Sequence, residues 1–193
     1  MVSNIPIIEM LDKSEAVELG KANDILEPIA ELNIFRTLLK HPTMAASIGK
    51  LLGVFLFQNK LDPKLRELII LRTGWLYGCN YEWTHHYEIA KAFKVDEDKI
   101  MAIRSEKIPS DIFDKTELII IRCVDEVKEF EYVTDATLKE LADSFIDNKD
   151  ELTLEVIGVA TTWKLITQIL RSLNIKLEDH LSDWPPDGKS ING

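Results

Sequence analysis

The chain has 193 residues, of which 46% are hydrophobic and 29% charged, a composition typical of one globular domain. Its formal net charge of −10 opposes binding to nucleic acids or anionic membranes, because their phosphates attract clustered Lys and Arg. The apolar runs are far shorter than the roughly 20 residues that cross a bilayer, and the first residues lack the pattern of a secretion signal. We therefore expect a cytoplasmic protein with neither a nucleic-acid nor a membrane partner.

Apolar residues recur at helical spacing along the chain, and no alternating pattern of strand length is present. This periodicity predicts an all-α fold of roughly eight helices in a single domain over residues 1–176. The Pro- and Asp-containing tail, residues 177–193, has no period and is expected to be a surface strap or disordered. The helical runs are expected at about residues 15–26, 30–39, 44–58, 63–77, 79–93, 96–103, 113–130, 134–145 and 150–173.

Helix boundary signals flank the strongly apolar run at about residues 63–77. Asp62 and Pro63 have the character of an N-cap and a first helical residue, and Gly78 is the expected break before the next helix. A similar sequence recurs at residues 67–73 and 117–123, Glu-Leu-Ile-Ile-(Leu/Ile)-Arg-(Thr/Cys). Apolar helices use few residue types, so we interpret this similarity as coincidence rather than as a structural repeat.

The stretch Gly78 to Ala90 gathers a thiol, two carboxylates and two imidazoles within a few turns. On a helix that begins near Cys79, the residues Cys79, Glu82 and His86 fall at i, i+3 and i+7 and share one face. The helix dipole and a protonated His86 favour a Cys79 thiolate, whereas the Glu82 carboxylate opposes it. Cys79 is therefore either a reactive thiol or a small buried residue.

Glu67 lies in an apolar run of the preceding helix, where a charged side chain usually needs a partner. In one straight helix it would stand about 18 Å from Cys79, at 1.5 Å per residue. It can join the site only if the chain turns back near Gly78. His86, Arg66 and Arg72 are then its candidate partners.

The sequence Arg66-Glu67-Leu68-Ile69-Ile70-Leu71-Arg72, followed by Tyr81-Glu82-Trp83-x-x-His86, resembles the carboxymuconolactone decarboxylase-like family, as does the run Leu32 to Thr37. That family is similar to the AhpD-type alkylhydroperoxidases. The resemblance extends over roughly residues 32–173. It implies an all-α fold, a helical hairpin that carries the site, and assembly into homo-oligomers.

In the peroxidase branch of that superfamily the pattern is a Glu, then Cys-x-x-Cys-x-x-x-His. Carried over, the Glu falls on Glu67, the first Cys on Cys79 and the His on His86, but the second, peroxide-reactive Cys falls on Glu82. Disulfide cycling within the motif is therefore impossible. The other cysteine, Cys123, lies on an apolar helix and is expected to be inert.

Two carboxylates and an imidazole in a partly apolar site suit proton transfer, because burial and mutual charge tune their pKa values towards neutrality. We expect Glu67, Glu82 and His86 to be catalytic, with Cys79 as an accessory. Arg72, His85 and Tyr81 are candidate substrate-binding residues, although His85 points about 100° away from His86 and aromatics such as Tyr81 more often serve packing.

Three functions follow from this set of residues. The first is a cofactor-independent acid–base enzyme of the decarboxylase or isomerase type, acting on a small organic acid or lactone. The second is a thiol peroxidase that uses Cys79, and the third is a non-enzymatic oligomeric binding protein. No metal or cofactor is expected, although Glu82, His85 and His86 are competent metal ligands by residue type.

Overall fold

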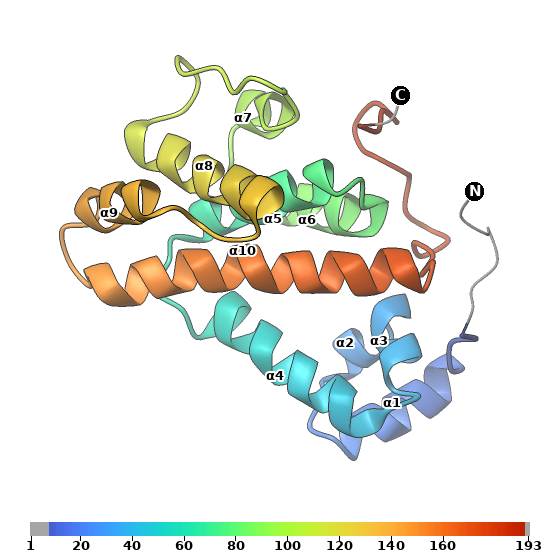
Figure 1. Cartoon of the computed structure of the whole chain (residues 1–193). Coiled ribbons are helices and arrows are strands. Elements are labelled where there is room, and N and C mark those ends of the chain that lie inside the picture. Colours follow the sequence, from blue (N-terminus) through green and yellow to red (C-terminus); the bar gives the residue numbers. More distant parts are fainter. Residues whose placement is uncertain (1–7, 192–193) are drawn as a thin grey trace. The chain divides into compact units, whose positions relative to one another are not determined.

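The computed structural model of the chain describes residues 8–191, and over these residues all regular structure is helical (Figure 1). The all-α class is confirmed, with ten helices instead of roughly eight. A short helix at residues 27–30 lies mostly before the expected run at 30–39, and the extended Leu32 separates it from the helix at residues 33–38. The helices are α1 (Lys13–Lys21), α2 (Glu27–Ala30), α3 (Asn33–Leu38), α4 (Pro42–Phe57), α5 (Pro63–Leu76), α6 (Asn80–Ala92), α7 (Glu97–Ala102), α8 (Lys115–Phe130), α9 (Asp135–Ser144) and α10 (Lys149–Ser172).

The helices form two compact units, and α10 contributes to both. The first unit comprises Met1–Gln58 and Gln168–Leu181, and the second comprises Asn59–Thr167 and Ser182–Gly193. In the first unit, the backbone N–H of Asn33 donates to Glu178 at 2.8 Å, which holds the segment after α10 against α3. The single domain over residues 1–176 stays a prediction, and residues 1–7 of that range lie outside the described part.

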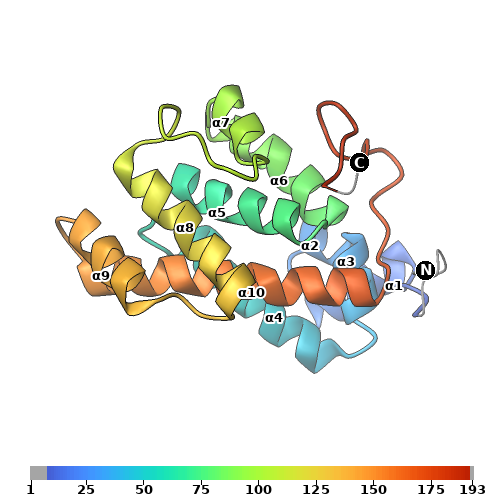
Figure 2. The same ribbon diagram turned by 45° about the horizontal axis from the view of Figure 1, so that its top comes forward.

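The second unit is built around the α5–α6 hairpin, whose two helices lie side by side in both views (Figure 2). Asp62 caps α5 by accepting from the Lys64 N–H at 2.8 Å, as its position before Pro63 predicted. At the other end the N–H of Gly78 donates to Trp75 O and that of Cys79 donates to Gly74 O. This pair of bonds is a Schellman motif, and it turns the chain into α6 after three residues.

Gly78 has a φ of 58°, a left-handed conformation that disfavours any residue with a Cβ atom. Replacing Gly78 with alanine is therefore expected to lower the free energy of unfolding by about 1 kcal/mol, measured by urea denaturation. Gly53 on α4 is the control, because a Cβ there meets nothing within 4 Å. Gly53→Ala should leave stability unchanged or raise it, so an equal loss from both variants contradicts the assignment.

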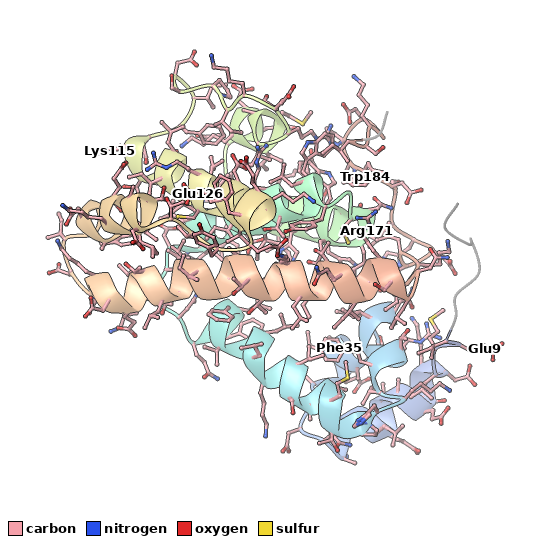
Figure 3. All side chains as sticks on the ribbon, in the orientation of Figure 1. Glu9, Phe35, Lys115, Glu126, Arg171 and Trp184 are labelled. Atoms are coloured by element: carbon pink, nitrogen blue, oxygen red, sulfur yellow. The ribbon has the colours of Figure 1, made fainter. Side chains whose placement is uncertain are left out.

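Residues 67–73 and 117–123 have similar sequences, but Glu117 has different partners from Glu67. Glu117 belongs to the capping box of α8 with Asp114, and its carboxylate binds Lys99 Nζ at 2.6 Å. Glu126, labelled in Figure 3, accepts hydrogen bonds from Thr134 and Thr137 at the start of α9. Glu117 therefore serves the helix start, and its similarity to Glu67 is one of sequence alone.

The C-terminal strap, here residues 182–191, packs on the second unit through Trp184, which Figure 3 labels. The ring of Trp184 lies 5.7 Å from that of Trp75 and 6.4 Å from that of Trp83. The indole N–H of Trp83 and the guanidinium of Arg104 both donate to Pro185 O, at 2.7 and 2.8 Å. Of the two alternatives for the tail, the described residues of the strap adopt the surface arrangement.

No helix among residues 8–191 is long and apolar enough to cross a membrane.

Candidate active site

Three helices of the second unit meet at the candidate site. Glu67 comes from α5, Glu82 and His86 come from one face of α6, and Trp163 comes from α10. Gly74 lets α5 and α6 approach closely, because a Cβ there would lie 3.1 Å from Trp83 N and 3.3 Å from Glu82 Cβ. The chain turns back between α5 and α6, and this turn brings Glu67 into contact with His86.

The imidazole of His86 is held on one side by Glu67. Its Nδ1 lies 2.6 Å from Glu67 Oε2, and Glu67 Oε1 accepts from Arg66 Nε at 2.9 Å. Arg66 Nη2 contacts the same oxygen at 2.9 Å. Glu67 is completely buried, so its charge is matched by these two partners instead of by water. Of its three candidate partners, the structure brings Arg66 and His86 to Glu67.

On its other side His86 faces Glu82 and Trp163. Its Nε2 lies 3.5 Å from Glu82 Oε2 and 3.2 Å from the indole Nε1 of Trp163. The two rings meet edge to face, with centroids 5.7 Å apart. An indole N–H only donates, so this hydrogen bond forms when His86 Nε2 is unprotonated and the imidazole proton is on Nδ1, towards Glu67.

The three ionisable groups have shifted pKa values. Burial raises the pKa of Glu67, but the charges and hydrogen bonds of His86 and Arg66 outweigh it, and the net shift is downward. Burial lowers the pKa of His86, but Glu67 and Glu82 together raise it above its ordinary value. For Glu82, burial outweighs the attraction of His86 and His85, so its pKa is raised. The site thus combines a carboxylate, an imidazole that favours its charged form and a carboxyl group that favours its neutral form.

The register of α10, which supplies Trp163, is fixed by Glu155. The Glu155 carboxylate accepts from the backbone N–H groups of Lys60 and Leu61, at 2.9 and 2.7 Å, just before α5 begins. Eight residues later, about 12 Å along the axis and about 80° around it, Trp163 lies on the adjacent face of α10. That face is apolar and buried, and in the second unit it consists of Val156, Val159, Ala160, Trp163 and Ile166.

Arg72 does not join the site. Its Nε donates to Asp125 at 2.7 Å, and its Nη1 donates to the carbonyls of Ile103 and Ser105 at 2.7 and 2.8 Å. The guanidinium therefore joins α5 to α8 and to the segment after α7. A role in holding a substrate carboxylate is not supported by this geometry, because these donors are already occupied within the fold.

Tyr81 and His85 lie one turn apart on α6, and their rings stack at 4.5 Å. Tyr81 is buried and His85 is partly exposed. A positive charge on His85 would lower the pKa of Glu82, against the larger effect of burial. Substrate binding by either residue stays a prediction.

The two cysteines differ in their positions and surroundings. Cys79 is the N-cap of α6 and is 3% exposed. Cys123 is fully buried on α8, and burial raises the pKa of its thiol to about 12. Both cysteines are free thiols. At neutral pH the Cys123 thiol is therefore protonated and unreactive, as its apolar surroundings predicted.

Within the described residues, no group of three or more His, Cys, Asp and Glu side chains has a metal-binding arrangement.

Trp163 is the one side chain of this constellation that the sequence did not identify. It lies 77 residues from His86, and a tryptophan in an apolar helical stripe looks like an ordinary core residue. Only the packing of α10 on the hairpin reveals that its N–H points at the imidazole.

The sequence of residues 42–111, which contains Glu67, Cys79, Glu82 and His86, matches the Carboxymuconolactone decarboxylase family. The match covers the α5–α6 hairpin, which carries these residues. The family resemblance stated from the Tyr81-Glu82-Trp83-x-x-His86 motif is thereby confirmed. A search of the curated proteins gave no match.

Solved structures show the same fold over most of the chain. The debrominase Bmp8 is 19% identical, with a TM-score of 0.73 over 92% of this chain and 95% of its own. A peroxidase-related protein with an alkylhydroperoxidase AhpD core, from Ralstonia eutropha JMP134, is 15% identical, with a TM-score of 0.68 over 93% and 94%. A peroxidase-related protein from Silicibacter sp. TM1040 is 9% identical, with a TM-score of 0.69 over 92% of each chain. At these identities the likeness shows the fold alone.

Proposed function

We propose that the chain is a cofactor-independent acid–base enzyme that acts on a small organic acid or lactone, by decarboxylation or isomerisation. The observation that carries this proposal is the contact between Glu82 and His86. A buried carboxyl group with a raised pKa lies 3.5 Å from an imidazole that Glu67 holds from behind. Such a pair exchanges one proton at little cost, which is what an acid–base catalyst near neutral pH requires.

The two ring nitrogens of His86 have different roles in the proposed proton transfer. Glu67, held by Arg66, fixes the orientation of the imidazole through Nδ1 and stabilises its charged form. Nε2 is then the nitrogen that gains or loses a proton next to Glu82. In a decarboxylation, the bond to the carboxylate breaks, CO₂ leaves, and the electron pair remains on a carbon conjugated with a carbonyl. Protonated Glu82 then donates its proton to that carbon, and His86 returns a proton to Glu82.

The comparisons support a small-molecule substrate in a limited way. A cysteine-to-alanine variant of the debrominase Bmp8 was solved in complex with 2,3,4-tribromopyrrole, and it shares this fold at 17% identity with a TM-score of 0.71. Tribromopyrrole is a ligand of Bmp8 in that structure. Assembly of this chain into a homo-oligomer stays a prediction, which the molecular mass in solution tests.

The second candidate is a thiol peroxidase that uses Cys79. Its position at the N-cap of the 13-residue helix α6 favours this reading, because unpaired N–H groups there stabilise a thiolate. The burial of Cys79 and the carboxyl group of Glu82 at the place of a second cysteine disfavour it.

Replacement of Cys79 by serine separates the two candidates. The acid–base proposal expects Cys79→Ser to retain turnover of whichever lactone or organic acid the wild-type chain converts in a substrate panel. It also expects Cys79 to remain unlabelled by a sulfenic acid probe after peroxide treatment. Peroxide-dependent labelling of Cys79 together with loss of turnover in Cys79→Ser would contradict the acid–base proposal and support the thiol peroxidase instead.

A further inference from the structure

The indole N–H of Trp163 has two acceptors within reach and one hydrogen to give. It lies 3.2 Å from His86 Nε2, and it is also a hydrogen-bond donor to the Glu82 carboxylate. Those two acceptors are themselves 3.5 Å apart and face each other. The donor therefore stands beside the two atoms between which a proton would move.

We propose that Trp163 is a positioning residue, whose N–H bonds to whichever of His86 Nε2 and Glu82 lacks the proton. This inference rests on the proposed acid–base function, since it describes how the same pair is prepared for proton transfer. When Nε2 is unprotonated it accepts the indole N–H across the 3.2 Å contact. When Nε2 carries a proton, that proton points at Glu82, and the indole N–H bonds to the carboxylate instead.

Few other groups compete for the hydrogen bond of the Trp163 N–H. Trp163 is 2% exposed, so water does not replace its hydrogen bond freely. The charged groups that act on His86 are Glu67 and Arg66 of α5 and Glu82 of its own helix. Glu82 is further influenced by His85 and Glu67. Glu67 is already engaged with Nδ1 of His86, so it does not contact the Nε2 side.

The bond needs an unprotonated partner, so it is absent when both groups are protonated and forms when the pair loses its first proton. Without the N–H, the pair holds that first proton more tightly. Trp163→Phe, which keeps an aromatic ring but no N–H, is therefore expected to raise the pKa of this first step, followed at the His86 imidazole, by roughly one unit. A purely structural role predicts the opposite sign. Looser packing admits water and moves the pKa down towards its ordinary value.

The measurement is the pH titration of the His86 imidazole by NMR, assigned by the signal that disappears in His86→Gln. Trp83→Phe is the matched control, because it removes another buried indole donor, whose acceptor is Pro185 O. An upward shift in Trp163→Phe alone supports the proposal. An unchanged or lowered pKa, or an equal rise in Trp83→Phe, overturns it.

A second measurement needs no variant in the core. In the wild-type chain the indole N–H resonance of Trp163 should titrate with the same midpoint as His86, while that of Trp83 stays constant. A constant Trp163 resonance across the His86 titration overturns the proposal. Neither measurement requires a substrate, so failure to find turnover would count against the proposed function without touching this result.

Discussion

Replacing Glu82 with glutamine is expected to lower kcat for the chain's substrate about 10²- to 10⁴-fold, the usual contribution of one general acid or base. Glutamine preserves the size of the side chain and its oxygen acceptor but neither gives nor takes a proton. The Glu82 carboxyl group lies against His86 Nε2 and the Trp163 N–H. The amide therefore occupies the same place while the proton path is broken.

The fold should tolerate this change well. The raised pKa of Glu82 means that the folded chain favours its neutral form, which glutamine imitates. Below pH 4.5, the ordinary pKa of this carboxyl group, the unfolding free energy of Glu82→Gln should match that of the wild-type chain within about 0.5 kcal/mol. Above that pH, a charged Glu82 destabilises only the wild-type chain, so the variant should become the more stable of the two.

Glu88→Gln is the control, because Glu88 lies on the same helix with a side chain that is 63% exposed. It should keep full activity and ordinary stability. If Glu82→Gln turns over substrate at the wild-type rate, the acid–base assignment loses its central residue.

The sequence predicted the hairpin and the positions of most of its polar side chains because those features are local. Asp62 and Pro63 mark a helix start, Gly78 marks a left-handed break, and Glu82 and His86 are four residues apart on one helix face. A hairpin with one such turn places Glu67 opposite His86. The family pattern pointed to the same pairing, now 2.6 Å between Glu67 Oε2 and His86 Nδ1.

The features that the sequence missed depend on contacts between distant segments. Arg72 looked available for a substrate because its partners, Asp125 and two backbone carbonyls, lie 31 or more residues away. Trp163 looked like core for the same reason. Hydrophobic periodicity identifies which face of a helix is buried, but it does not say which polar atom on a neighbouring helix a buried N–H will reach.

The second large effect concerns stability, and it comes from Glu67. Replacing Glu67 with glutamine is expected to lower the free energy of unfolding by about 3 kcal/mol, because it removes the buried negative charge that pairs with Arg66 and His86. It also removes the anion that holds a proton on His86, so the pKa of His86 should fall. Urea denaturation measures the first effect and NMR titration the second.

The loss should depend on pH with a definite sign. The pKa of Glu67 is lowered from 4.5, so its stabilising effect is complete above pH 4.5 and is lost as the pH falls through the lowered pKa. The pKa of His86 is raised from 6.5, so its effect is complete below pH 6.5 and is lost as the pH rises through the raised pKa. The difference between the wild-type chain and Glu67→Gln should therefore be largest between pH 4.5 and 6.5.

Glu155→Gln provides the matched control, because Glu155 is also buried in the second unit but accepts from the backbone N–H groups of Lys60 and Leu61. Glutamine keeps one of its oxygens, so this variant should lose only about 1 kcal/mol. Equal losses from Glu67→Gln and Glu155→Gln would mean that the Arg66–Glu67–His86 charges contribute no more than ordinary hydrogen bonds. A larger loss at Glu67, confined to its pH window, identifies the ion pair as the element that both stabilises the hairpin and keeps His86 charged beside Glu82.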